Sequence, residues 1–188
     1  MTTTVIASPL AWIATHRAQP PVIYVAHPVA PAPGDCIAEC LKCRARRLYA
    51  ASGSLDLRSL CEHDAPVSHS SKRDEIVAYN LERALRWWRW LETLEAAVFT
   101  MPWYTNVTAN GEGDPAKIKR GLRDDVEIVK RCDALILCGP RISSGMRIEA
   151  DTAHAAGKSV FRVGHIVPGN GEPPDWPADQ TPWARWEP

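Results

Sequence analysis

The chain has 188 residues, enough to bury the core of one domain, or of one domain with an appendage. Its 22 Lys and Arg residues offset 22 Asp and Glu residues, so no net charge favours nucleic acid or an anionic membrane. It lacks an apolar run of the roughly 20 residues that a membrane helix needs, and its start lacks the basic flank of a signal peptide. We therefore expect no membrane partner and a cytoplasmic location. Six cysteines in such a chain indicate buried thiols or metal ligands rather than disulfides.

The first predicted strand follows an N-terminal segment, residues 1–20, that we interpret as a tail or an added strand. The run "VIYVAHP", residues 22–28, is short, apolar and ended by proline, which is typical of a fully buried strand. The Pro-rich "VAPAPGD" after it is incompatible with regular structure. Residues 36–70, which are rich in Cys and Arg, are therefore predicted to form a small insertion.

The insertion carries a candidate zinc site. Zinc prefers four thiolate or imidazole ligands in a tetrahedron, and close pairs across a short loop supply them in small sites. A segment this poor in large apolar residues also gains most from a metal. The alternative is that these are ordinary thiols whose spacing arose by chance. The candidate ligands are Cys40, Cys43, Cys61 and His63, with Cys36 as an alternative to His63.

Basic residues in the same insertion raise the question of nucleic-acid binding. A small basic zinc module can contact nucleic acid, but a run of charge is more often a solvated face. Because the whole chain is neutral, nucleic acid is the disfavoured partner. The residues concerned are Lys42, Arg44, Arg46, Arg47 and Arg58.

Residues 72–95 show apolar residues at helical spacing over an unusually wide arc. A helix with such a wide apolar surface contacts more than one neighbour. We therefore assign Trp87, Trp88 and Trp90 to the core and to a subunit contact, in preference to a ligand-stacking platform, and expect a homo-oligomer.

A second buried strand is predicted in residues 96–103, "AAVFTMPW", with its end at Pro102. The polar, Gly-containing residues 104–115 are predicted to be a long loop at the end of this strand, in the position of a lid.

The next helix is predicted to begin near Pro115, with Ile118, Leu122, Val126 and Val129 at helical spacing and Asp125 within it. A buried strand, residues 134–138, follows. The turn "GPRISSG" then leads into a helix over residues 146–156, ended by Gly157, whose first turn is expected to carry Glu149.

The last predicted strand is "SVFRVGH", residues 159–165. We place the α/β domain at residues 21–166 and a Pro- and Trp-rich tail at residues 167–188. Trp176, Trp183 and Trp186 of this tail are expected to pack on the domain or on a neighbouring subunit, because exposed tryptophans are costly.

Apolar strands that alternate with helices predict a flavodoxin-like or Rossmann-like parallel sheet covered by helices on both faces, an α/β fold. Right-handed crossovers bring all the strand ends to one edge, where such folds bind ligands. The candidate substrate-binding residues at this edge are His27, Trp103, Ser143, Ser144, Gly145 and Met146.

Five stretches together resemble the nucleoside 2-deoxyribosyltransferase superfamily, in particular its phage and bacterial branch. The resemblance covers residues 22–36 and 75–164, and its most specific part is the G-x-x-x-E turn from Gly145 to Glu149. The stretches are "IYVAHP", "NLERALRWWRWLE", "MPW", "DVEIVKRCDALILCG" and "SSGMRIEADTAHAAGKSV".

The resemblance implies that Glu149 is the nucleophile, that Asp125 moves a proton at the base, and that Tyr24 lines the nucleobase pocket. The chemistry is sound, since a carboxylate can trap an oxocarbenium-like sugar while a second acid protonates the departing base. No cofactor is needed. Two positions depart from the family: Ser143 replaces an aspartate and His27 replaces a glycine. His27 is then either an extra acid or base in the pocket or a histidine hydrogen-bonded to a strand end.

We therefore expect cleavage or transfer of the N-glycosidic bond of a nucleoside or nucleotide. The alternatives are a non-catalytic nucleotide-binding module and a hydrolase of NAD or of a modified nucleotide.

Overall fold

The computed structural model describes nine stretches of the chain: residues 5–6, 9–16, 19–29, 70–110, 114–139, 141–163, 173–175, 177–181 and 183–186. The chain divides into two compact units, one formed by Met1–Pro28 with Arg83–Pro188 and the other by Val29–Glu82. The candidate zinc ligands and the basic cluster of the insertion lie outside the described residues. In the second unit, the Asn80 amide donates a 2.9 Å hydrogen bond to the carbonyl of Val29.

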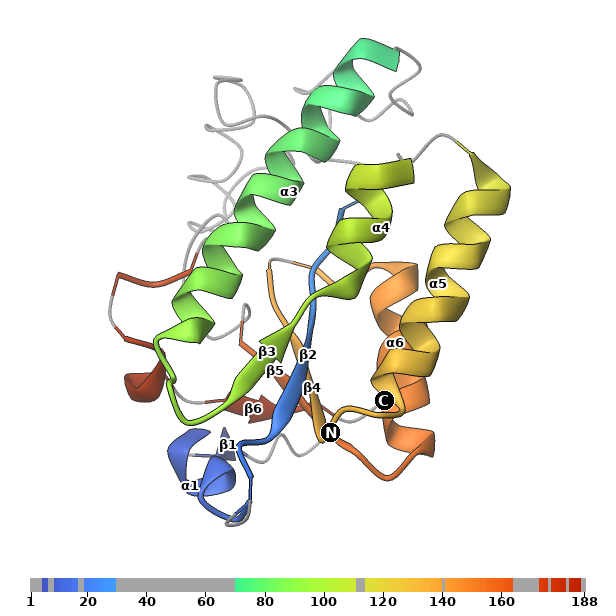
Figure 1. Cartoon of the computed structure of the whole chain (residues 1–188). Coiled ribbons are helices and arrows are strands. Elements are labelled where there is room, and N and C mark those ends of the chain that lie inside the picture. Colours follow the sequence, from blue (N-terminus) through green and yellow to red (C-terminus); the bar gives the residue numbers. More distant parts are fainter. Residues whose placement is uncertain are drawn as a thin grey trace, which may run out of the picture. The chain divides into compact units, whose positions relative to one another are not determined.

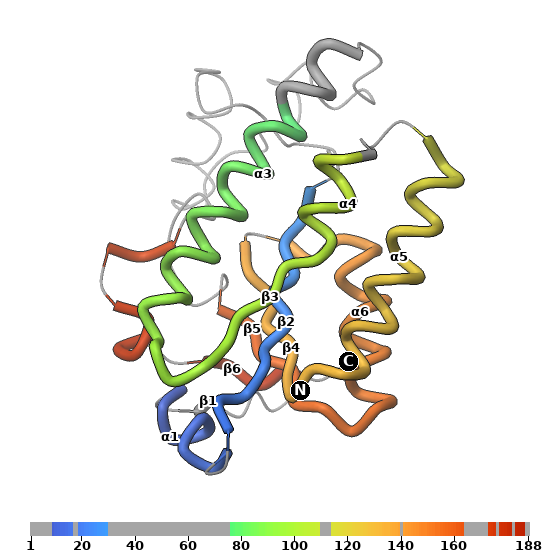
Figure 2. Tube along the Cα trace, viewed as in Figure 1, coloured from blue at the N-terminus to red at the C-terminus, as the bar shows by residue number. Residues whose placement is uncertain are grey.

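The first unit is built on a six-stranded sheet with the order β1-β6-β5-β4-β2-β3. β2 pairs in parallel with β3 and β4, and β4 pairs in parallel with β5, so this part of the sheet has the predicted α/β architecture. The tube in Figure 2 shows β2 and β4 side by side although more than a hundred residues separate them. The strands are Val5–Ile6 (β1), Val22–Ala26 (β2), Val98–Thr100 (β3), Ala134–Leu137 (β4), Ser159–Arg162 (β5) and Trp183–Arg185 (β6).

Asp133 fixes the register of the central strands together with the backbone hydrogen bonds between β2 and β4. Its carboxylate accepts a 2.8 Å hydrogen bond from the backbone N–H of Val22, and its own N–H donates to the Val22 carbonyl at 2.8 Å. These bonds join the beginning of β4 to the beginning of β2. Because side chains alternate along a strand, this register decides which residues of β2 face each layer of helices.

Helices connect the strands and cover both faces of the sheet (Figure 1). The part of α3 in the first unit packs on one face, and α6 contacts β4 and β5 from the other. α5 lies between α4 and α6. The helices are Pro9–Ile13 (α1), Ser70–Glu92 (α3), Pro102–Asn110 (α4), Pro115–Val129 (α5), Ser144–Ala155 (α6) and the 3-10 turn Ala178–Gln180.

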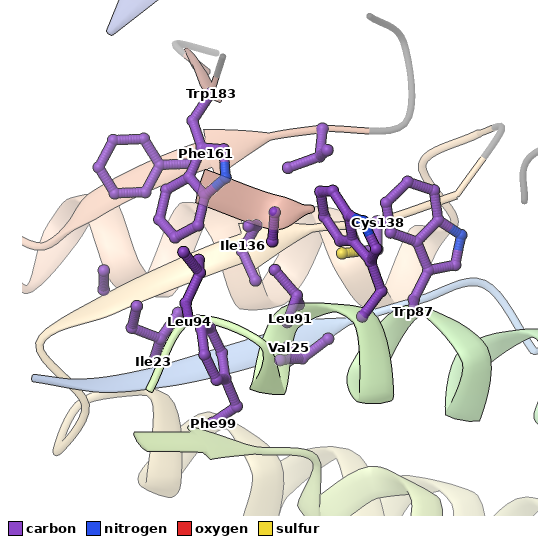
Figure 3. Close-up of a cluster of buried hydrophobic side chains, with 14 of the residues drawn as sticks. Ile23, Val25, Trp87, Leu91, Leu94, Phe99, Ile136, Cys138, Phe161 and Trp183 are labelled. Carbon is purple, nitrogen blue, oxygen red and sulfur yellow. The ribbon is translucent and has the colours of Figure 1, made fainter. Parts of the chain in front are cut away.

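The main hydrophobic core lies between α3 and the sheet. Figure 3 shows Trp87 and Leu91 of α3, and Leu94 just after the helix, gathered in one cluster with Val25 and Ile136 of the strands. Trp87 and Trp90 meet edge to face, with ring centroids 5.4 Å apart. The prediction that Trp87 and Trp90 belong to the core is confirmed, and the partly buried Trp88 packs against the same cluster.

The expected loop over residues 104–115 is wrong. Most of it is helix α4, which begins at Pro102 directly after β3. The indole N–H of Trp103 donates a 2.7 Å hydrogen bond to the Val25 carbonyl of β2 and so attaches the first turn of α4 to the sheet. The polar, β-branched composition of α4 gives a weak local helix signal, and these tertiary contacts outweigh it. A lid is therefore not supported here.

Both terminal segments add to the sheet. β6 lies antiparallel to β5, and β1 lies antiparallel to β6, so the added-strand interpretation of the N-terminal segment is confirmed. The expectation that tail tryptophans pack on the domain is confirmed for Trp183, which is fully buried in the core. Trp186 stacks on His154 of α6 with ring centroids 5.6 Å apart, while Trp176 lies outside the described residues. Within the described part of the chain, every helix is too short or too polar to cross a membrane.

Candidate functional site

A buried polar cluster lies between the sheet and the helices on the face opposite α3. At its centre, the Tyr24 hydroxyl of β2 donates a 2.8 Å hydrogen bond to Glu149 Oε1 of α6. Tyr24 is completely buried and Glu149 is 5% exposed. Strand alternation explains this placement, because Ile23 and Val25 face α3 and the intervening Tyr24 must face the other way.

Glu149 lies one turn further into its helix than the sequence suggested. The helix begins at Ser144, and its first turn holds no acidic residue. The expectation of a first-turn glutamate is therefore wrong, and the helix dipole, which acts on the terminal turn, contributes little at this position. Glu149 is instead buried, and its carboxyl group accepts a hydrogen bond from the Tyr24 hydroxyl.

Asp125 enters the cluster from α5. It is 4% exposed, and its Oδ1 accepts a 3.1 Å hydrogen bond from Asn106 Nδ2 of α4. α4 lies against α5 beside Gly121, one turn before Asp125, where an added Cβ would be in ordinary van der Waals contact. A Cβ placed on Gly121 would lie 3.5 Å from Asn106 Cβ. Asn106 was not predicted as a site residue, because it falls in the segment that was expected to be a loop.

The buried face of α5 is also different from the predicted one. The four apolar residues at helical spacing suggested that their stripe faces the core, yet Ile118 is exposed. The residues that are buried are Gly121, Asp125 and Val129, which recur every four positions. Asp125 therefore occupies a core position in its helix, which is where a carboxylate is most costly and requires partners.

Burial is the largest cause of a raised pKa in all three acidic groups of the cluster. Burial raises the pKa of Glu149 to about 8, the charge of Asp125 adds to this, and the Tyr24 hydroxyl acts in the opposite direction. Burial raises the pKa of Asp125 to about 7, opposed by the hydrogen bond from Asn106. Burial and the charge of Glu149 hold the pKa of Tyr24 well above its usual value. The cluster thus holds two carboxyl groups that titrate near neutral pH.

The other predicted substrate-binding residues mostly have structural partners. The Ser143 hydroxyl caps α6 by accepting a hydrogen bond from the Met146 N–H at 3.3 Å, and the Ser143 N–H contacts the Met146 sulfur at 3.5 Å. Met146 is buried, Ser144 is exposed and Gly145 is partly buried. Trp103 anchors α4 as described above. The hydrogen bonds of Ser143 and Trp103 therefore stabilise the fold.

His27 belongs to a different environment from the carboxylates. It follows β2, is 4% exposed, and neither ring nitrogen has a hydrogen-bond partner among the described residues. Burial holds the pKa of His27 well below its usual value, and the positive charges of Arg83, Arg141 and Arg86 lower it further. A backbone hydrogen bond at Pro28 acts on the His27 pKa in the opposite direction, so the role of His27 at the strand end stays a prediction.

The described residues contain no group of three or more His, Cys, Asp or Glu side chains suited to a metal ion. The two cysteines that they include, Cys132 and Cys138, are free buried thiols, as expected. Burial raises the pKa of Cys132 to about 11 and that of Cys138 further, so both remain protonated and unreactive at neutral pH.

Comparison with known proteins identifies one matching family model. Residues 71–163 match the Domain of unknown function (DUF7768). This region runs from α3 to the residue after β5 and includes Asn106, Asp125 and Glu149, whereas Tyr24 lies before it. No curated protein and no solved structure gives a significant match to the chain. The description of this family names no activity.

That chemistry is acid–base and nucleophilic. At neutral pH, two buried carboxyl groups with pKa values of about 7 and about 8 are each partly protonated and partly ionised. Such a pair can supply a carboxylate nucleophile and a proton donor in one site. Buried side chains that carry such shifts mark a candidate site rather than a routine surface ion pair.

Proposed function

We propose that the protein cleaves or transfers the N-glycosidic bond of a nucleoside or nucleotide, with Glu149 as nucleophile and Asp125 as proton donor. The observation that carries the proposal is the buried cluster in which Tyr24 hydrogen-bonds Glu149 and Asp125 lies close enough for its charge to raise the Glu149 pKa. The resemblance of the sequence to nucleoside 2-deoxyribosyltransferases supports the same three residues.

In the first step, a Glu149 carboxylate oxygen attacks the anomeric carbon of the sugar as the bond to the base breaks. The electron pair of that bond leaves with the base, and the Asp125 carboxyl proton neutralises it. In the second step, an acceptor base or water attacks the glycosyl ester and releases the Glu149 carboxylate. The incoming nucleophile gives its proton to Asp125, which restores the starting state. An acceptor base gives transfer and water gives hydrolysis.

The pKa values define the productive ionisation state. The first step needs Glu149 ionised and Asp125 protonated, and both groups titrate near neutral pH. The population of this state is therefore greatest at about pH 7.5, between the two pKa values. The Tyr24 hydroxyl favours this state, because it donates to Glu149 and stabilises the carboxylate.

The test is to incubate the protein with a panel of deoxynucleosides, nucleoside monophosphates and NAD, and to separate the free base by chromatography. The wild type should release base from at least one substrate. E149Q and D125N should abolish release, because each removes one reacting carboxyl group while keeping the side-chain shape. D151N and E127Q change exposed carboxylates on the same two helices and should leave release unchanged.

Trapping of a covalent sugar intermediate by mass spectrometry tests the role of Glu149 directly. The adduct should map to the peptide that contains Glu149. Base release by the wild type without any adduct, together with unchanged release by E149Q, would refute the mechanism.

A second candidate function is a non-catalytic nucleotide-binding module. The observation that favours it is the depth of the cluster: Tyr24 has no exposed surface, and each carboxylate is about 95% buried. A satisfied polar network at this depth also fits a rigid binding scaffold. A binding module would raise the melting temperature on addition of the nucleotide without releasing base.

A further inference from the structure

Asn106 is a side chain of the buried polar cluster to which the proposed reaction assigns no role. It lies on α4 and is partly buried, and its Nδ2 donates a 3.1 Å hydrogen bond to Oδ1 of Asp125 on α5. α4 and α5 pack against each other, so this bond joins two neighbouring helices at a carboxyl group.

Two contacts position Asn106. Trp103, three residues earlier on the same side of α4, donates its indole N–H to the Val25 carbonyl of β2 at 2.7 Å. Toward α5, a Cβ added to Gly121 would lie 3.5 Å from Asn106 Cβ and 3.7 Å from its Nδ2. Gly121 is one turn before Asp125 on the buried face of α5. Asn106 therefore lies over the turn that leads to Asp125, where a short amide side chain reaches the carboxyl group.

The hydrogen bond makes the two oxygens of Asp125 unequal. An amide N–H is a donor only, so Oδ1 accepts from it whether Asp125 is protonated or ionised. When the carboxyl group is protonated, its proton is therefore on Oδ2. Within the described residues Oδ2 makes no hydrogen bond, and it is not one of their fully enclosed unpartnered atoms, so it keeps some contact with solvent. The oxygen that carries the proton is thus also the one open to a reacting group.

Loss of the Asp125 proton strengthens the hydrogen bond from Asn106. A hydrogen bond to an ionised acceptor is roughly twice as strong as one between neutral groups. The bond therefore stabilises ionised Asp125 more than protonated Asp125, and it lowers the Asp125 pKa against the larger effect of burial. An interaction that grows stronger as the proton leaves favours the transition state over the ground state.

We propose that Asn106 is a positioning residue for the proton donor of the proposed reaction. It keeps Oδ1 of Asp125 as a hydrogen-bond acceptor, so that Oδ2 delivers the proton to the departing base. The O–H bond at Oδ2 breaks as an N–H bond forms on the base. The electron pair of the O–H bond stays on Oδ2, and the Asn106 N–H stabilises the resulting carboxylate. This inference rests on the proposed function, in which Asp125 is the acid.

The first test follows the Asp125 proton by NMR titration of protein labelled with carbon-13 at the aspartate side-chain carboxyl groups. The Asp125 signal is assigned by its absence in D125N. N106L keeps a side chain of similar shape and removes the donor, so the titration midpoint of Asp125 should move to higher pH by about 1, which corresponds to one hydrogen bond to a charged group. T105A changes an exposed residue of α4 and should leave the midpoint unchanged. An unchanged midpoint in N106L would overturn the inference.

Base release tests whether the bond acts in the reaction. N106L should lower kcat at pH 7 by about tenfold and leave KM within about twofold, because the bond strengthens only as Asp125 ionises. N106A is the second variant, since it removes the packing of the side chain as well as the donor. Similar losses of kcat in the two variants would support the role of the hydrogen bond. A loss in N106A alone would assign the effect to packing and overturn the inference.

A substrate that needs no proton gives a measurement that a purely structural role would not alter. The base of 7-methyl-2′-deoxyguanosine is already positively charged, so it leaves as a neutral molecule without protonation. After correction for the rate without protein, N106L should release this base within about twofold of the wild-type rate, whereas release from 2′-deoxyguanosine should fall about tenfold. Equal losses on the two substrates would contradict a role for Asn106 in proton transfer.

NMR titration and base release together separate this inference from the proposed function. A raised Asp125 midpoint in N106L, with no base released by the wild type from any substrate, would refute the catalytic function and leave Asn106 as the group that controls the Asp125 proton. Base release that is lost in D125N but unchanged in N106L and N106A would refute the inference and leave the catalytic function standing.

Discussion

The most direct physical test of the cluster is the pH dependence of stability in E149Q. Glutamine keeps the shape of Glu149 and an oxygen that accepts from the Tyr24 hydroxyl, but it never ionises. In the wild type, the Glu149 pKa rises from 4.5 in the unfolded chain to about 8 in the folded protein. The folded state therefore holds this proton more tightly than the unfolded state, so the stability that Glu149 contributes is complete below about pH 4.5 and is lost as the pH rises through 8.

The magnitude follows from the two pKa values. Each pKa unit corresponds to about 1.4 kcal/mol, so the wild type should lose about 3.5 kcal/mol of unfolding free energy between pH 5 and pH 8 through this group. E149Q lacks this loss. Its unfolding free energy should be within about 1 kcal/mol of the wild type at pH 5 and should exceed it by about 4 kcal/mol at pH 8. Asp125 titrates in both proteins, so its contribution largely cancels in the difference.

The assay is urea denaturation followed by tryptophan fluorescence at both pH values, because the core tryptophans report on unfolding. E127Q is the matched control, since Glu127 is exposed on the surface of α5 and pairs with Lys130 at 2.6 Å. The control should not become more stable than the wild type as the pH rises. A difference between E149Q and the wild type that is the same at pH 5 and pH 8 would refute the reasoning.

Three further predictions follow from other parts of the chain. In urea denaturation, G139A should lower the unfolding free energy by at least about 2 kcal/mol, because an added Cβ would lie 2.9 Å from His27 Nε2. G157A is the control, because Gly157 has a φ of 70° but nothing lies within 4 Å of an added Cβ, and it should lower the unfolding free energy by roughly 1 kcal/mol. Equal losses would contradict the close approach at Gly139. N106A removes the hydrogen bond that lowers the Asp125 pKa, so this pKa should rise. In the pH profile of base release, the acidic and basic limbs should then lie closer together or move to higher pH. An unchanged profile would exclude Asn106 as a positioning residue. Metal analysis of the purified protein should find about one equivalent of zinc that is lost on C40S, and metal-free wild type would exclude the zinc site.

Local sequence signals were sufficient wherever an element carries its own start, stop and apolar pattern. α5 begins after an Asp114 cap with Pro115 in its first turn, and α6 begins after the Ser143 cap and ends before Gly157. β2 and β4 are continuous apolar runs and are buried throughout most of their length. These features act over a few residues, so the sequence predicted both the elements and the α/β class.

Other features depend on contacts between distant segments, and the sequence did not predict them. α4 has weak intrinsic helix propensity and is held by the Trp103 bond to Val25 and by Asn106. β6 acquires its position only by pairing with β5 and β1. In each case the stabilising partner is remote in the chain, so a local pattern carries little information about it.

The candidate site divides in the same way. The sequence by itself determined that carboxylates on two helices and a tyrosine on the first parallel strand were available, and its resemblance to a known family suggested a reaction for them. Only the tertiary structure decided that the Tyr24 hydroxyl meets Glu149 across 125 positions, that Asp125 faces inward with Asn106, and that His27 is buried after β2. The physical reason is that strand register sends alternate residues to opposite faces, and register is fixed by pairing between strands rather than by any one strand alone.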